Sequence, residues 1–74
     1  MGWQNNKKIT GLWAHGPSLR WVWIYVQDLG WRLLWNDSDS AMVSMATLAI
    51  WAKSKDRFVN VYEEDNKIKE IYAW

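Results

Sequence analysis

The stretch LRWVWIYVQ, residues 19–27, decides the fold class of this chain. Read with a period of two residues, it divides into an aliphatic side and an aromatic side. The aliphatic side holds Val22, Ile24 and Val26, and the aromatic side holds Trp21, Trp23 and Tyr25. Alternating β-branched and aromatic residues predict a β-strand whose aliphatic side faces a core. The aromatic side then needs a second covering surface.

Strands are also predicted on both sides of this stretch. Residues 8–13 are rich in β-forming side chains and end at Gly16 and Pro17, which break a strand. The short turn at residues 28–30 predicts that residues 31–35 return antiparallel to residues 19–27.

A helix is predicted from about residue 40 to residue 54, after a run of N-cap candidates at residues 36–40. One apolar stripe at helical spacing is formed by Met42, Met45, Ala46, Ala49 and Ala52. A narrow polar stripe is formed by Ser40, Ser44, Thr47, Trp51 and Lys55. Most of the remaining helix surface is apolar, which is typical of a helix covered on more than one side. One small sheet cannot cover it fully, so association between subunits is expected.

Residues 57–62 and 67–74 are predicted to form a closing hairpin across the turn at residues 63–66. The order is then β-β-β-α-β-β, a mostly β chain with one helix. This order matches the five-stranded Greek-key barrel called the OB-fold. We therefore predict a single OB-fold domain over residues 1–74.

Composition narrows the classes of function. The net charge is only +1, which provides no general field for binding nucleic acid or an anionic membrane. No apolar run reaches the ~20 residues that cross a bilayer, so membrane insertion is not expected. The absence of cysteine and the single histidine argue against a disulfide framework and a histidine-based metal site.

Tryptophan content is the anomaly of this sequence. Eight tryptophans occur in 74 residues, and a subunit this small cannot enclose them all. Several must therefore meet another subunit, a ligand or water.

The second half of the sequence resembles a known family. Met42, Met45, Leu48 and Ala52 lead into the strand Val59-Asn60-Val61-Tyr62 and then into Asn66-Lys67 and Ile71. This pattern resembles the helix and final hairpin of bacterial AB5-toxin B subunits of the cholera type. The front half, with Ile9-Thr10-Gly11-Leu12 before an aromatic and aliphatic strand, is more similar to the subtilase and pertussis type.

The resemblance implies a secreted protein that forms a homopentameric ring, with helices around a central pore and glycans bound outside. Ser40, Ser44 and Thr47 would then suit a pore-facing stripe. No catalytic A subunit is contained in this chain.

Two groups of residues are candidates for ligand binding. The row Trp21, Trp23 and Tyr25 fits either a contact with a neighbouring subunit or a platform for sugar rings, and large apolar patches more often mark association. Trp31 and Trp35 could extend either surface. By resemblance, Tyr62, Asn66 and Lys67 occupy the place of an aromatic residue and an Asn-Lys pair in the cholera-type sugar pocket. An ordinary hairpin turn is the simpler explanation of these residues, and turn statistics favour it.

Catalytic and metal-ligating patterns are not found. His15 stands without a nucleophile or carboxylate at useful spacing, and Asp37 and Asp39 lie where helix caps belong. Residues 63–65 fit a solvated loop rather than a calcium loop. We therefore expect no catalytic residues, no metal, no cofactor and no enzymatic activity.

Three functions follow from these observations. The leading hypothesis is a ring-forming glycan-binding subunit resembling the toxin B subunits. A single-stranded nucleic-acid-binding OB domain is the alternative from another class, and it requires Lys7, Lys8, Arg20 and Arg32 to cluster. The third possibility is an oligomer whose tryptophans serve only assembly.

Overall fold

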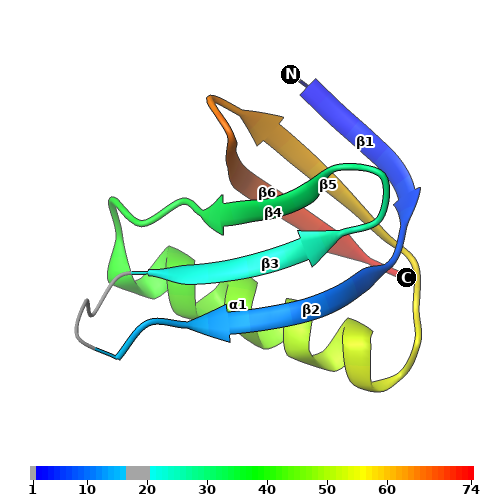
Figure 1. The fold of residues 1–74 in the computed structure, drawn as a ribbon, viewed down its shortest axis with the longest axis horizontal. Coiled ribbons are helices and arrows are strands. Elements are labelled where there is room, and N and C mark those ends of the chain that lie inside the picture. Colours follow the sequence, from blue (N-terminus) through cyan, green and yellow to red (C-terminus); the bar gives the residue numbers. More distant parts are fainter. Residues whose placement is uncertain (1, 17–20) are drawn as a thin grey trace.

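The computed structural model describes residues 2–16 and 21–74. Within them the chain is mostly β with one helix (Figure 1). Four strands, β1 (Gly2–Lys7), β2 (Ile9–Ala14), β3 (Val22–Val26) and β4 (Gly30–Leu34), precede the helix α1 (Asp39–Ser54). Two further strands, β5 (Val59–Glu64) and β6 (Lys67–Ala73), form the C-terminal hairpin.

These strands form one six-stranded mixed sheet in the order β1-β5-β6-β4-β3-β2. All neighbouring pairs are antiparallel except β4 and β6, which run parallel over the short register Leu33↔Lys67 and Leu34↔Ile68. The two edge strands, β1 and β2, follow one another in the chain with only Lys8 between them (Figure 1). They are not paired with each other, so the sheet is not closed.

The predicted five-stranded barrel therefore differs from the observed architecture. The main correction is β1, which the sequence analysis did not predict. Its polar segment GWQNNK has no alternating pattern, and β1 becomes a strand because it pairs with β5, more than fifty residues away in the chain. The other elements lie within about two residues of their expected positions, apart from residues 19–20, which lie outside the described residues, as does Pro17.

The aliphatic side of β3 faces the core, as predicted. Ile24 and Val26 are fully buried, whereas Tyr25 between them is exposed. Burial of such a side chain contributes about 1.5–3 kcal/mol to folding. The core cluster consists of Ile9, Ile24, Val26, Leu34, Met42, Met45, Ala49, Ala52, Val59, Val61 and Ile68.

Helix α1 covers the inner face of the sheet with the predicted stripe, of which Met42, Met45, Ala49 and Ala52 are buried. Its N-cap is Ser38, whose hydroxyl accepts a hydrogen bond from the Ala41 N–H at 3.4 Å. Capping was expected of Asp37 and Asp39, but Asp39 is already in the first turn of the helix. Asp37 instead accepts a hydrogen bond from the Trp35 indole N–H at 3.2 Å.

The C-terminal hairpin turns more tightly than predicted. Glu63 and Glu64 belong to β5, and only Asp65 and Asn66 form the turn. Both turn residues have positive φ, 56° and 62°. This geometry is that of a two-residue hairpin turn matched to the twist of the strands. The expectation of a solvated loop at residues 63–65 is therefore wrong for Glu63, which is buried.

Candidate functional site

An aromatic surface covers the outer side of β2, β3 and β4, on the opposite side of these strands from α1. Register explains its composition, because cross-strand partners share one face of a sheet. Trp13 lies opposite Trp23, and Tyr25 lies opposite Trp31. His15 continues the row by donating its backbone N–H to the Trp21 carbonyl at 2.9 Å. We call this surface the aromatic face; its members are Trp13, His15, Trp21, Trp23, Tyr25 and Trp31.

The rings of the aromatic face hold each other in place. Trp13 and Trp23 stack with ring centroids 6.1 Å apart and an interplanar angle of 25°. Trp31 meets Tyr25 edge to face at 5.4 Å and Trp13 edge to face at 6.4 Å. Such pairs contribute about 0.5–1.5 kcal/mol each beyond their buried area. The surface is therefore preorganised rather than a set of independent side chains.

Gly11 provides the space that Trp31 occupies. A Cβ atom at this position would lie 3.1 Å from Cη2 of Trp31 and 3.1 Å from Cβ of Tyr25. The Trp31 ring therefore reaches from β4 across β3 and over the backbone of β2. A glycine inside a strand often marks a close approach of this kind.

The aromatic rings remain largely accessible to solvent. The exposed fractions are 49% for Trp13, 44% for Trp21, 40% for Tyr25 and 44% for Trp31. Trp23 is half-buried among its neighbours. Nδ1 of His15 and Nε1 of Trp23 are buried, and neither has a hydrogen-bond partner among residues 2–16 and 21–74. Trp21 and Tyr25, two of the three residues predicted to form the row, are therefore exposed. Either a ligand or a neighbouring subunit can cover them.

Sequence reasoning missed Trp13 as a member of this face. Alternation within β2 places Gly11 and Trp13 on one side of that strand, but only the register with β3 assigns that side to the aromatic face. Trp31 extends the face, as the sequence analysis allowed. Trp35 does not belong to it, because that side chain packs against the core cluster.

The second predicted group is divided between β5, the hairpin turn and β6. Tyr62 packs against Trp3 of β1, with ring centroids 5.5 Å apart, and lies opposite Glu70 in the register. Asn66 is exposed in the hairpin turn. Lys67 lies opposite Leu33, which itself lies opposite Trp23, so Lys67 borders the aromatic face on the same cross-strand row. Lys67 thus shares a cross-strand row with Trp23, whereas Tyr62 lies two residues from Glu64, the partner of Lys67 on β5.

The basic side chains expected for nucleic-acid binding are engaged in ion pairs. Lys7 pairs with Asp28 at 2.9 Å and Lys8 pairs with Asp56 at 2.9 Å. Arg32 lies on the inner side of β4 and pairs with Glu63. Arg20 lies outside the described residues. No basic groove therefore runs beside the aromatic face within residues 2–16 and 21–74.

The Arg32–Glu63 pair joins two strands that are not neighbours in the sheet, since β6 lies between β4 and β5. The guanidinium Nε donates to Oε2 of Glu63 at 2.5 Å, and Glu63 is 8% exposed. This hydrogen bond, together with the charge of Arg32, holds the pKa of Glu63 below its usual value of 4.5. The pair is a structural clamp across the inner side of the sheet.

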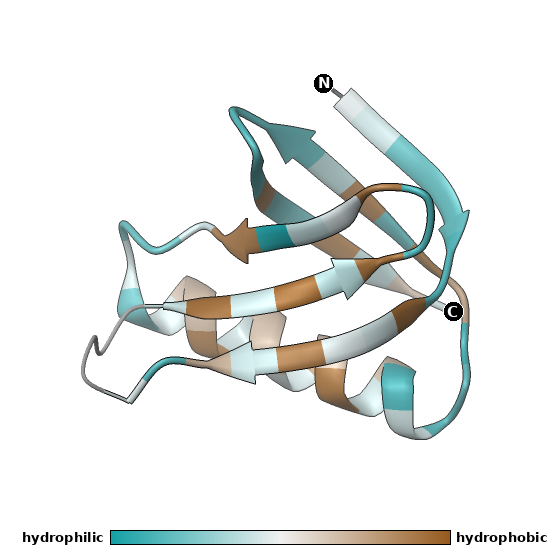
Figure 2. Ribbon diagram, in the orientation of Figure 1, coloured by the Kyte–Doolittle hydropathy of each residue, from teal (hydrophilic) through white to brown (hydrophobic). Residues whose placement is uncertain are grey.

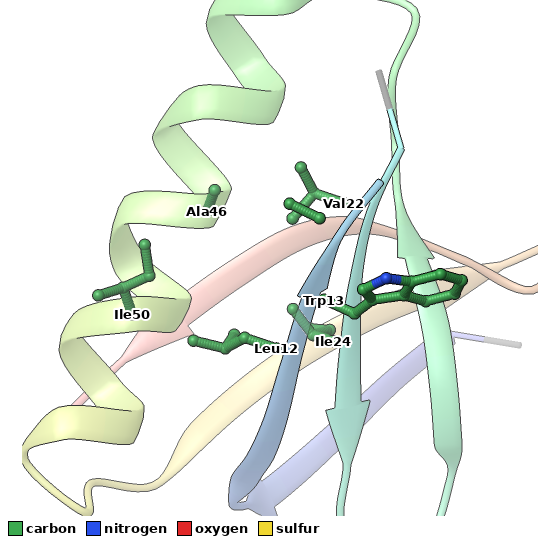
Figure 3. A pocket seen from close by; sticks show the side chains of 7 residues that line it. Leu12, Trp13, Val22, Ile24, Ala46 and Ile50 are labelled. Carbon is green, nitrogen blue, oxygen red and sulfur yellow. The ribbon is translucent and has the colours of Figure 1, made fainter. Parts of the chain in front are cut away.

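A shallow hollow of about 220 Å³ lies on the other side of β2, between the strand and α1. Its lining consists of aliphatic residues and Trp13, and Figure 3 shows Leu12, Val22, Ala46 and Ile50 around this space, with the Trp13 ring directed away from the helix. Such a lining provides no general acid, base or nucleophile. Among the described residues, no group of three His, Asp or Glu side chains is placed to hold a metal ion.

Comparisons with protein-family models, curated proteins and solved structures give no match. Within residues 2–16 and 21–74, no helix has both the length and the apolar character that a membrane span requires. Function must therefore be argued from the geometry of the aromatic face.

Proposed function

We propose that the chain is a non-enzymatic binding subunit that recognises carbohydrate through the aromatic face and works as a homo-oligomer. One observation carries the proposal: four aromatic side chains fixed by ring contacts remain 40–49% exposed on one side of the sheet. A surface rigid before binding loses little entropy when a ligand is placed on it.

Sugars fit this surface by their chemistry. The C–H face of a pyranose ring is apolar and flat enough to lie on an indole, while its hydroxyls stay at the rim. Aromatic side chains offer such an apolar body with a polar tip. The Tyr25 hydroxyl, the bordering Lys67 and the indole N–H groups of the exposed tryptophans can serve as rim partners, whereas the N–H of Trp23 is buried.

Stacking of nucleic-acid bases would use the same rings, but it also needs cations along the phosphate backbone. Lys7, Lys8 and Arg32 are all paired with carboxylates, and the net charge is +1. The electrostatics therefore favour a sugar over a nucleic acid.

Oligomerisation is supported by the outer surface of α1. One flank of the helix carries Val43 and Ile50, exposed by 59% and 53%. The other flank carries Leu48 and Trp51, exposed by 38% and 41%. Thr47 lies between the two flanks. A twofold contact through either flank leaves the other bare, whereas a head-to-tail contact covers both and forms a ring when the rotation between subunits closes.

We further propose that the fold is an OB-type barrel and the ring a pentamer, as the resemblance implies. The path of the chain supports the barrel. Strand β1 pairs with β5, and β2, which follows β1 directly in the chain, pairs with β3. If β1 and β2 act together as one bent strand, that strand pairs at both ends of the sheet and would close such a barrel. Several sugar sites on one ring would raise the effective affinity for a cell surface.

The decisive experiment compares Trp21→Ala with Phe58→Ala. Both side chains are exposed aromatics, at 44% and 48%, but Phe58 precedes β5 and is not part of the aromatic face. A glycan array first selects a sugar, and calorimetry then measures its affinity for each variant. Loss of one stacked ring should weaken binding by about tenfold or more, if a sugar ring stacks on an indole about as strongly as a nucleobase does, at about 1–3 kcal/mol. Phe58→Ala should bind normally.

Light scattering separates sugar binding from assembly. Trp51→Ala should lower the oligomer mass while leaving the affinity for a single free sugar unchanged. If Trp21→Ala lowers the mass and no glycan binds the unmodified protein, the aromatic face is a subunit interface and the carbohydrate proposal is wrong.

A further inference from the structure

A second aromatic surface lies on the outer side of β1, β5 and β6, and it differs from the aromatic face by containing a carboxylate. Register places Trp3 opposite Tyr62, and Tyr62 opposite Glu70. Tyr72 is two residues beyond Glu70 on the same strand, so both side chains point to the same side. We call this surface the acidic aromatic face; its members are Trp3, Tyr62, Glu70 and Tyr72.

The outward direction of these side chains follows from burial. Val59, Val61 and Glu63 of β5 are buried, so Tyr62, between Val61 and Glu63, points away from the core. The exposed fractions of Trp3 and Tyr72 are 49% and 55%.

Ring contacts fix this surface as they fix the aromatic face. Trp3 and Tyr62 meet edge to face with centroids 5.5 Å apart. Tyr72 meets Trp74 edge to face with centroids 4.8 Å apart. Tyr62 and Tyr72 lie diagonally across two strands, a spacing of about 7–8 Å between backbones that long side chains span. Glu70 therefore lies between two ordered aromatic pairs.

Glu70 is exceptional among the carboxylates of the two C-terminal strands. Glu63 pairs with Arg32, and Glu64 pairs with Lys69 at 2.7 Å. The hydrogen bond to Glu64 also raises the pKa of Lys69, so that ammonium is committed to Glu64. Glu70 forms no ion pair or hydrogen bond with any residue in the described part of the chain. An unpaired carboxylate thus lies opposite Tyr62 in the register and two residues from the exposed Tyr72.

We propose that the acidic aromatic face binds a small organic cation, specifically a quaternary ammonium group. A cation over an aromatic ring is attracted by the negative potential of the ring face, and a nearby carboxylate adds a direct Coulomb attraction. A quaternary ammonium suits rings better than a metal ion does, because its methyl groups are apolar and its hydration is weak. The aromatic face has no carboxylate and does not offer this combination.

This site goes beyond the proposed carbohydrate function and shares no residue with it. The rings of the two sites also lie on different strands, since those of the aromatic face come from β2, β3 and β4, and only the rim residue Lys67 is on β6. Either proposal can therefore fail without the other.

Choline and its neutral isostere 3,3-dimethylbutan-1-ol provide the test, because they have the same shape and differ in charge. Chemical-shift titration of the full chain should show choline binding at least tenfold more tightly than the alcohol, with shifts confined to β1, β5 and β6. That factor corresponds to about 1.4 kcal/mol. Equal affinity for the two probes, or no binding of choline at millimolar concentrations, would overturn the proposal.

Glu70→Gln should lower choline affinity by about tenfold or more, a size typical of a charge-based contact at a partly shielded site. Asp65→Asn is the matched control, because Asp65 is an exposed carboxylate in the neighbouring hairpin turn without an aromatic partner. Equal loss in both variants would show only a general effect of net charge and would refute a site at Glu70. Trp21→Ala, which alters the carbohydrate site, should bind choline as the unmodified protein does.

Discussion

The clamp between Arg32 and Glu63 leads to a prediction about stability in acid. The change is Glu63→Gln, which keeps the shape of the side chain and removes its charge. Arg32 would then remain on the inner side of β4, opposite the buried Ile24, without its anionic partner. We expect a loss of stability at neutral pH that disappears as the pH falls.

The magnitude follows from the geometry of the pair. The distance from Nε to Oε2 is 2.5 Å, and the exposed fractions of the two side chains are 22% for Arg32 and 10% for Glu63. A hydrogen bond to a charged group contributes about 1.5–3 kcal/mol, whereas an exposed ion pair contributes about 0–1 kcal/mol. Because the guanidinium still reaches solvent, we expect about 1.5 kcal/mol. For a domain of this size that corresponds to about 6–12 °C in Tm.

The pH dependence has a definite sign. Arg32 lowers the pKa of Glu63 in the folded protein below its usual value of 4.5. A carboxyl group with a lowered folded pKa stabilises the fold above its unfolded pKa, and this contribution is lost as the pH falls through the folded pKa. The unmodified protein and Glu63→Gln should therefore differ fully at pH 7 and converge in strong acid, at about pH 2.

Thermal unfolding followed by far-UV circular dichroism at both pH values measures this difference. Glu64→Gln is the matched control, because it removes the charge from a more exposed ion pair. The side chains of Glu64 and its partner Lys69 are 36% and 33% exposed. That variant should change Tm by only a few degrees at pH 7, since exposed pairs contribute little. A Tm difference for Glu63→Gln that is absent at pH 7, or equal at both pH values, would refute the clamp.

Two further predictions concern the aromatic face and the hairpin turn. Gly11→Val should displace the Trp31 ring, because a Cβ alone would lie 3.1 Å from that ring and from Tyr25. The near-UV circular dichroism signal should then lose intensity, and the free energy of unfolding should fall by about 1–3 kcal/mol. An unchanged spectrum would mean that the ring does not cross Gly11. Asn66→Gly should raise stability by up to about 1 kcal/mol, because φ at Asn66 is 62° and glycine adopts such a turn more readily. The same variant should bind the selected glycan normally, whereas loss of binding would restore Asn66 as a ligand residue.

The candidate site was only partly predictable from the sequence. Alternation placed Trp21, Trp23 and Tyr25 together, because the two-residue period of a strand fixes which side chains share a side. Periodicity within one strand does not specify the neighbouring strands. Trp13 could therefore join the aromatic face only once the register Trp13↔Trp23 was known.

Tyr62, Asn66 and Lys67 illustrate the limit of a resemblance between short patterns. These residues are close in sequence, but Tyr62 lies opposite Glu70 while Lys67 lies opposite Glu64. A register shift between Tyr62 and Glu63 lies between these two pairs. The partners of each side chain thus depend on an irregularity that the local sequence does not signal.

Short-range patterns in the sequence determined the aliphatic side of β3, the buried stripe of α1 and the existence of the C-terminal hairpin, because each depends on residues within a few positions of one another. Figure 2 shows the alternation along β3 as bands of different hydropathy. The tertiary structure alone decided that the polar segment Gly2–Lys7 becomes a strand, since its partner β5 lies far along the chain. It also decided that Glu63 is clamped by Arg32 while Glu70 is left among aromatic rings. Three glutamates in one hairpin look alike in sequence, and only the strand order and register assign each one its surroundings.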